Sequence, residues 1–245
     1  MSKGGSDLGG DQIEGRRAVL ELLRGSRRPR AVYLSSAVAS DDVAEIVERA
    51  GGLLKVVAPE RLEQMARSEV HQGIVAMAPP LRPVDIDDLL AVEGAFLVAV
   101  DGVTDPRNLG AIMRSAETAG ATGIVLPRHR SVRITPVVAK AAAGAIEYLP
   151  IALVGGIPAA LDRAKRAGCW AVGLDETGDR SLFDLDLADQ PLVLVLGSEG
   201  RGLARLTRDR CDVLVRIPAH GHLASLNVSA AATLACHEVA RRRHR

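Results

Sequence analysis

Short apolar runs separated by helix-like segments are the feature that most limits how this chain can fold. FLVAV from Phe96, GIVLP from Gly123 and LVLVL from Leu192 carry no polar side chain. Such runs suit strands that are buried on both faces, as in a parallel sheet covered by helices. Helix-like segments or glycine-rich turns follow these runs, so we predict a mostly parallel α/β fold.

A smaller α/β block precedes these runs. A helix-like segment from Gly15 ends near Gly25, and AVYLS from Ala31 is typical of a strand. The three prolines of PPLRP, from Pro79, can continue neither a strand nor a helix. We therefore expect a disordered tail over residues 1–12, a small domain over 13–78, a linker over 79–94 and a larger domain over 95–245.

Several protein classes are excluded by composition. No run reaches the ~18 apolar residues of a membrane span, and MSKGGSDLGGDQ has no apolar signal core. Cys169, Cys211 and Cys236 form no CxxC pair and no disulfide framework. His220 and His222 lack a third metal ligand nearby. We expect a cytoplasmic protein with no membrane partner and no metal.

The first unusual strand end in the larger block is DPRNLGAIMR, from Asp105. Asp105 can cap a helix whose first residue is Pro106. Arg107, Asn108 and Arg114 then lie near the start of this helix. They are either solvated groups on a capped surface helix or part of a phosphate or ribose site.

The second is LVLGSEGRGL, in which Gly197, Gly200 and Gly202 follow a wholly apolar strand. The spacing is GxxGxG, which is neither the dinucleotide fingerprint nor a P-loop. Glu199 inside the turn would repel a phosphate but suits a ligand with hydroxyl groups or a cationic centre. A purely structural turn is the alternative.

The third is IPAHGHLASLNVSAA, from Ile217. We expect Ser225 to cap a last helix that runs to about Arg241, with Asn227 in its first turn. An ordinary capping cluster is the alternative interpretation.

In this order, NLGAIMR, LVLGSEGRGL and IPAHGHLASLNVSAA resemble the three signature motifs of the SpoU family of RNA 2'-O-ribose methyltransferases, within the SPOUT superfamily. GRRAVLELL from Gly15 and HQGIVA from His71 resemble the small N-terminal substrate-binding domain of this family. The resemblance covers residues 14–241, and bacterial 23S rRNA guanosine-2'-O-methyltransferases are the most similar members.

The resemblance implies S-adenosylmethionine (SAM) as cofactor, a homodimer, and a C-terminal trefoil knot that no sequence periodicity indicates. Residues 13–78 would bind RNA, and residues 95–245 would form the SAM-binding methyltransferase domain. The catalytic candidates are Arg114, Asn108, Glu199, Asn227 and Ser225. The cofactor-binding candidates are Gly197, Ile217, Leu226, Leu196, Gly200 and Ser198.

The role of Arg114 stays open at this stage. It either activates the ribose hydroxyl or, because a guanidinium is very rarely deprotonated, anchors a phosphate and stabilises alkoxide charge. Two alternatives to an rRNA enzyme also remain: a non-catalytic RNA-binding or ribosome-assembly protein, and the same chemistry on tRNA. A nucleotide-dependent dehydrogenase is disfavoured by the GxxGxG spacing.

Charge supports an RNA partner through its distribution rather than its total. The formal net charge is only +1, yet arginines cluster at the start of the small domain and around the first motif. The RNA-binding candidates are Arg16, Arg17, Arg27, Arg28 and Arg107. Since the chain has only two Phe, two Tyr and one Trp, we expect it to recognise folded RNA by shape and backbone contacts.

Overall fold

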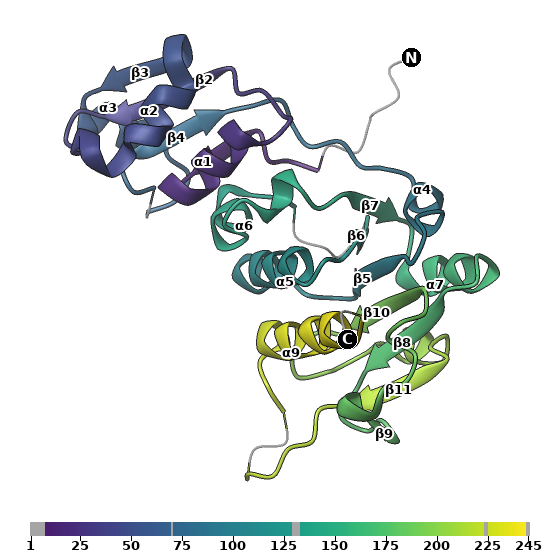
Figure 1. Cartoon of the computed structure of the whole chain (residues 1–245). Helices are drawn as coiled ribbons and strands as arrows, with labels where there is room; N and C mark the ends of the chain where they lie inside the picture. The colour runs from purple at the N-terminus through teal and green to yellow at the C-terminus, as the bar shows by residue number, and fades with distance from the viewer. Residues whose placement is uncertain (1–7, 70, 129–132, 223–224, 244–245) are drawn as a thin grey trace. The chain divides into compact units, whose positions relative to one another are not determined.

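The computed structural model describes residues 8–69, 71–128, 133–222 and 225–243, which form two compact units (Figure 1). Unit 1 contains the chain up to Arg82 together with Arg133–Tyr148. Unit 2 contains Pro83–Val132 and Leu149–Arg245.

Unit 1 is built on a four-stranded mixed sheet of order β1-β4-β2-β3, in which β2 and β3 are parallel and the other pairs antiparallel. Its strands are β1 (Gln12–Glu14), β2 (Ala31–Ser35), β3 (Leu54–Val57) and β4 (Ile74–Met77). Its helices are α1 (Arg16–Arg24), α2 (Ala44–Ala50), α3 (Pro59–Met65) and α6 (Pro136–Ala141), with 3-10 turns at Ser40–Val43, Gly51–Leu53 and Ala145–Glu147.

Polar groups of distant segments hold unit 1 together. The Arg27 guanidinium forms a 2.5 Å ion pair with the buried carboxylate of Glu147 and also donates to the carbonyl oxygens of Gly10 and Pro79. The backbone N–H of Gly10 donates to the carbonyl of Ile134 at 2.7 Å. Residues 8–12 of the expected disordered tail are therefore folded, and residues 1–7 lie outside the described residues.

Unit 2 is an all-parallel sheet of order β7-β6-β5-β10-β8-β11-β9, as the apolar runs predict. Its strands are β5 (Phe96–Val100), β6 (Gly123–Pro127), β7 (Ile151–Val154), β8 (Trp170–Leu174), β9 (Arg180–Ser181), β10 (Leu192–Leu196) and β11 (Val213–Arg216). The chain leaves β5 toward β6 and β7, and β10 later pairs with the other side of β5. The carboxyl ends of β5 and β10 thus mark a topological switch point, the place where ligands of α/β proteins bind.

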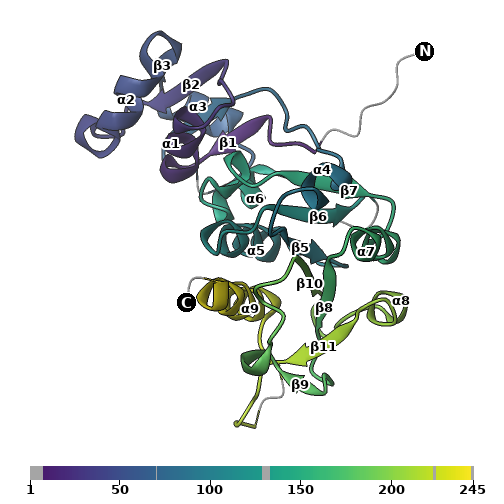
Figure 2. The same cartoon turned by 45° about the vertical axis from the view of Figure 1, so that its right-hand side comes forward.

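Helices cover both faces of this sheet (Figures 1 and 2). One face packs against α4 (Ile86–Leu90) and α7 (Ile157–Arg166), whose apolar residues share a core with Leu97, Ala99 and Val193. The other face packs against α5 (Pro106–Thr118) and α9 (Val228–Arg243). The short helix α8 (Arg205–Arg208) lies between β10 and β11 in the chain. Burial on both faces explains why β5, β6 and β10 need no polar residues.

The last turn of α9 is fixed to the opposite edge of the sheet from the switch point. The Arg243 guanidinium donates to the carbonyl oxygens of Gly94, Ala188 and Gln190 at 2.6, 2.7 and 2.7 Å. It also lies 5.2 Å from the ring centroid of Phe96, at the start of β5. Burial lowers the pKa of Arg243.

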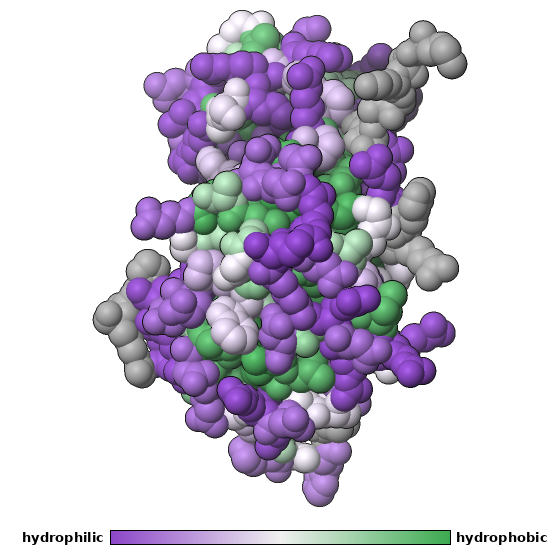
Figure 3. Space-filling model, turned by 90° about the vertical axis from the view of Figure 1, so that its right-hand side faces the viewer, coloured by the Kyte–Doolittle hydropathy of each residue, from purple (hydrophilic) through white to green (hydrophobic). Residues whose placement is uncertain are grey.

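Hydrophilic residues cover most of the face drawn in Figure 3, and apolar residues are confined to smaller areas between them. Among the described residues, no helix is both long enough and apolar enough to cross a bilayer.

Candidate active site at the switch point of the sheet

The three motifs meet at the carboxyl edge of the unit 2 sheet. β5 and β10 are neighbours in parallel register, with Val100 opposite Leu196, so their following loops start side by side. The Asp101 N–H donates to the Leu196 carbonyl at 2.8 Å, which extends this pairing one residue beyond β5. β8 and then β11 follow β10 across the sheet.

The first motif begins α5. The Asp105 carboxylate accepts from the Arg107 N–H at 2.7 Å and Pro106 occupies the first turn, as predicted. Asn108 in this turn is 9% exposed. Arg114, farther along α5, is exposed, and its guanidinium makes no hydrogen bond or ion pair with any described residue. Its charge is therefore available to a ligand.

The second motif is a tight turn whose first residue must be glycine. Ser198 and Gly202 exchange two backbone hydrogen bonds, of 2.9 and 3.0 Å. A Cβ on Gly197 would lie 2.2 Å from the carbonyl carbon of Gly202, closer than any real contact allows. Gly200, at the tip, has a φ of +72° and is exposed. The turn thus presents backbone groups to the edge of the sheet.

The third motif follows β11 and leads into α9. Ile217 is half-buried directly after β11, and Leu226 is 51% exposed. The prediction that Ser225 caps the last helix is wrong, because α9 begins at Val228 and the carboxamide oxygen of Asn227 accepts from the N–H of Ser229 at 2.8 Å. Asn227 forms the cap and Ser225 is an exposed loop residue. Both residue types are good caps, so the sequence could not decide between them.

Glu199 joins all three motifs. Its Oε1 accepts a hydrogen bond from Nδ2 of Asn108 and another, 3.4 Å long, from Nδ2 of Asn227. Since Asn227 uses its carboxamide oxygen for the helix cap, its nitrogen is turned toward Glu199. The structure therefore brings together three of the five catalytic candidates, namely Asn108, Glu199 and Asn227.

Sequence reasoning missed two residues at this edge. Leu174 ends β8, between β10 and β11, and is register partner to both Leu196 and Val215. Asp101 directly follows β5, and its carboxylate accepts from the buried hydroxyl of Thr207 at 2.5 Å. A carboxylate at the end of a wholly apolar strand was the available signal for Asp101.

The residues at this edge suit a cofactor such as SAM, which has an adenine ring and a cationic sulfonium. Backbone groups at Gly197 and Gly200 can bind ring edges, and Ile217, Leu226 and Leu174 offer apolar surface. Glu199 adds a negative charge. Among the described residues, no group of three or more metal-ligating side chains occurs.

The cysteines contribute no reactive thiolate here. Burial raises the pKa of both Cys211 and Cys236 to about 12, so these thiols stay protonated at neutral pH. Burial raises the pKa of Cys169 as well.

The predicted RNA-binding arginines fall into two groups. Arg16, Arg17 and Arg27 form ion pairs with Asp42, Glu21 and Glu147, at 3.1, 2.9 and 2.5 Å. Arg28 and Arg107 are exposed, and their guanidinium groups make no hydrogen bond or ion pair with any described residue. A phosphate can therefore bind Arg28 or Arg107 without competing with a carboxylate, unlike Arg16, Arg17 and Arg27.

Family models match both units. Residues 95–237 match the SpoU rRNA methylase family. The chain belongs to this family. Residues 12–84 match the RNA 2'-O ribose methyltransferase substrate-binding domain. The predicted family and enzyme class are confirmed: the protein is a SpoU-family RNA methyltransferase with an RNA substrate-binding domain.

Named relatives cover nearly the whole chain. YacO of Bacillus subtilis, which is named for the TrmH family of tRNA/rRNA methyltransferases, is 37% identical over 96% of both chains. A protein of Mycobacterium ulcerans that is named as a tRNA/rRNA methyltransferase is 40% identical over 95% of this chain and 77% of its own length.

Solved structures agree with the family. The SpoU methyltransferase AviRb of Streptomyces viridochromogenes, in complex with AdoMet (SAM), aligns with a TM-score of 0.79 at 29% identity, over 95% of this chain and 90% of its own. An AdoMet-bound rRNA methyltransferase of Sinorhizobium meliloti aligns with a TM-score of 0.76 at 28% identity, over 94% and 87%. SpoU methyltransferases have a knotted α/β fold, so the predicted fold class is confirmed.

Proposed function

We propose that this SpoU-family protein transfers a methyl group from SAM to a ribose 2'-hydroxyl in RNA, with 23S rRNA as its substrate. The observation that carries the proposal is the shared acceptor Glu199, which holds Asn108 and Asn227 together at the switch point of the sheet. The 2'-O position is supported by the substrate-binding match at residues 12–84, and the cofactor by the AdoMet-bound relatives.

In this proposal the second and third motifs hold the cofactor. Backbone groups of Leu196, Gly197, Ser198 and Gly200 would bind it together with the side chains of Ile217 and Leu226. When bound, SAM supplies an electrophilic methyl group on a sulfonium.

The catalytic residues surround the reacting hydroxyl. The unpaired guanidinium of Arg114 would bind the adjacent phosphate and stabilise the negative charge that develops on the ribose oxygen. Asn108, Glu199 and Asn227 would fix the orientation of the ribose, because Glu199 Oε1 is already saturated by two amide donors and its second oxygen can accept from a hydroxyl. Ser225 would contact the substrate from the loop before α9.

The units divide the work between them. We assign RNA binding to residues 13–78 of unit 1 and methyl transfer to unit 2, whose core includes α4 from the expected linker over residues 79–94. Arg28 and Arg107 are the phosphate contacts we favour. The enzyme would act in the cytoplasm, where rRNA is assembled into ribosomes.

A homodimer is part of the proposal. Leu234 on α9 is 42% exposed, and small residues flank it along the same helix. Light scattering should give twice the monomer mass, and Leu234→Glu should reduce it.

Mapping of 2'-O-methyl groups tests the function and separates rRNA from tRNA, since YacO is named for both. One 23S rRNA position should lose its methyl group in a deletion strain and regain it with the wild-type gene but not with Arg114→Ala. Loss at a tRNA position instead would favour the tRNA alternative. Unchanged maps of both RNAs would favour the non-catalytic alternative.

A further inference from the structure

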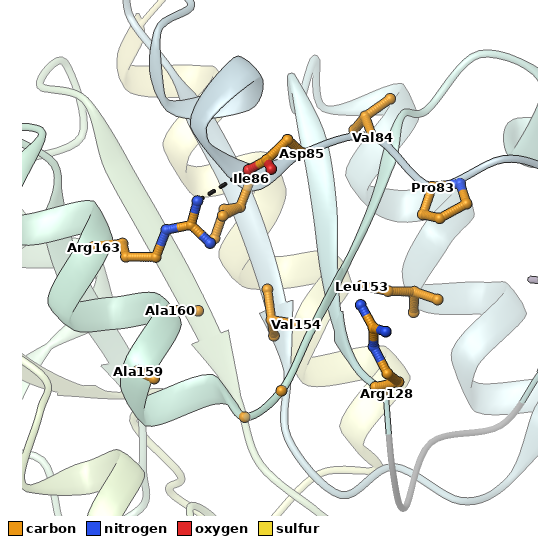
Figure 4. A pocket seen from close by; sticks show the side chains of 12 residues that line it. Pro83, Val84, Asp85, Ile86, Arg128, Leu153, Val154, Ala159, Ala160 and Arg163 are labelled. Atoms are coloured by element: carbon orange, nitrogen blue, oxygen red, sulfur yellow. Dashed lines mark hydrogen bonds and ion pairs between the residues drawn. The ribbon is translucent and has the colours of Figure 1, made fainter. Parts of the chain in front are cut away.

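A cavity of about 410 Å³ opens in unit 2 beyond the carboxyl ends of β6 and β7 (Figure 4). Its walls are Arg128 after β6, residues 153–156 at the end of β7, the first two turns of α7 and the segment 83–86. This volume is typical of pockets for small ligands or parts of larger ones. None of the site residues described above lines it.

Two open glycines form part of its lining. A Cβ on Gly155 would meet no atom within 4 Å, and one on Gly156 would meet only Cδ of Pro158, at 3.9 Å. Neither glycine has a positive φ. Neither crowding nor backbone conformation therefore requires glycine here. The missing side chains leave the backbone accessible from the cavity.

One of the two arginines that line the cavity has no partner for its guanidinium among the described residues. Arg163 and Arg128 lie on opposite sides of it, with Val154 between them in Figure 4. Arg163 forms ion pairs with Asp85 at 3.0 Å and Asp87 at 2.6 Å, so two carboxylates more than neutralise its charge. The exposed guanidinium of Arg128 makes no hydrogen bond or ion pair with any described residue. An anion is therefore favoured beside Arg128.

The cavity lies on the same sheet edge as the first motif. β7 pairs with β6 and β6 with β5, so the end of β7 is two strand spacings, about 10 Å, from the end of β5. Asn108 follows β5 in the first turn of α5. An RNA strand whose target ribose is at Asn108 would reach the cavity with a nearby nucleotide.

We propose that this cavity is a subsite for a nucleotide that flanks the methylated one, with its phosphate on Arg128 and its sugar or base over Gly155 and Gly156. This inference rests on the proposed function, because it takes RNA as the substrate at Asn108. The subsite would contribute to RNA binding rather than to methyl transfer.

Two variants and two matched controls test the subsite. Arg128→Gln removes the charge, and Gly155→Leu fills the cavity. Arg166→Gln and Arg166→Leu change an exposed arginine of α7 outside the cavity, the first to remove its charge and the second to add a leucine there. The measured quantities are KM and kcat with an unmodified 23S rRNA transcript, the Kd for SAM, and Tm.

We expect KM to rise about tenfold in Arg128→Gln and Gly155→Leu, with kcat and the Kd for SAM within about twofold of wild type. The controls should match wild type. The slope of log affinity against log salt should fall by about one in Arg128→Gln only. If Gly155→Leu lowers Tm strongly, Arg128→Gln alone decides.

Unchanged KM in Arg128→Gln, while the wild type methylates the transcript, would overturn the subsite and leave the proposed function intact. Weakened SAM binding in both variants would also overturn it. If the wild type transfers no methyl group, the proposed function fails. Filter binding of the same transcript then judges the subsite, and equal affinities of wild type and variants would refute it.

Discussion

The side-chain amide of Asn227 lies 3.4 Å from Oε1 of Glu199, the oxygen that also accepts from Asn108. Asn227 precedes α9, Asn108 lies in the first turn of α5, and Glu199 lies in the turn after β10. One carboxylate oxygen thus fixes two carboxamides that the chain supplies from opposite ends of the domain.

Glu199→Ala should lower methyl transfer by at least about 100-fold, because both carboxamides lose their shared acceptor. Glu199→Gln keeps an acceptor oxygen and should retain part of the activity. Since Glu199 is exposed, unfolding free energy should change by no more than about 0.5 kcal/mol. Glu176→Ala, an exposed glutamate after β8, is the control. Full activity of Glu199→Ala would show that this contact is dispensable.

Arg114→Ala should abolish turnover and leave the Kd for SAM nearly unchanged, because its guanidinium makes no hydrogen bond or ion pair with any described residue. Arg114→Lys keeps the charge without the planar fork and should recover a fraction of the activity if the residue anchors a phosphate. Methylation assays paired with calorimetry of SAM binding measure both. Near-wild-type turnover of Arg114→Ala would remove this residue from the site.

Gly197→Val should weaken SAM binding at least about tenfold and lower Tm. The added side chain would collide with the backbone of Gly202, so the whole turn must move. Gly52→Val, where the added Cβ meets nothing, is the control. Unchanged calorimetric affinity for SAM would mean that the turn does not bind the cofactor.

Acid should destabilise the protein partly through Glu238. The guanidinium groups of Arg241 and Arg242 lower the pKa of this carboxyl from its ordinary value of 4.5 to about 2. The ionised form therefore stabilises the fold fully above pH 4.5, and this contribution is lost as the pH falls toward 2.

Denaturant unfolding of wild type and Glu238→Gln should differ by about 1 to 2 kcal/mol at pH 7, after solvent screening of the two arginines, and should converge near pH 2. Glu48→Gln, an exposed glutamate of α2, should show no such convergence. A constant difference across the pH range would contradict the assignment.

Arg27→Met should destabilise unit 1 by about 3 kcal/mol, because it leaves the buried carboxylate of Glu147 without its partner. The double variant Arg27→Met with Glu147→Leu should recover much of this loss. Any loss of RNA binding in Arg27→Met should then recover as well. Persistent loss of RNA binding in a stable double variant would instead identify Arg27 as a direct phosphate contact.

The sequence predicts β5, β6 and β10 well because each of these apolar runs can be buried only between two layers of helices. β1 was missed because its three residues include the polar Gln12 and Glu14. Glu14 is fully buried, and its carboxylate accepts hydrogen bonds from the backbone N–H groups of Arg67 and Ser68, more than fifty residues away. No local pattern indicates such a contact.

Each motif of the site could be placed at a strand end, but their meeting point could not be derived. That point depends on the order of the strands in the sheet, in which β10 lies between β5 and β8. This order differs from the order of the strands along the chain. The sequence pattern also does not predict that Arg133–Tyr148 belongs to unit 1, because this depends on contacts between distant residues such as Arg27 and Glu147.

The anchoring of Arg243 to backbone carbonyls has a consequence for how the site loses its structure. α9 begins directly after Asn227, which donates to Glu199, and it ends at Arg243, which holds the start of β5. The site and this anchor are therefore joined by one helix. Local opening of the site then requires undocking the whole helix. Amide exchange along α9 should follow global unfolding, and heat should abolish catalysis and tertiary structure in one cooperative step.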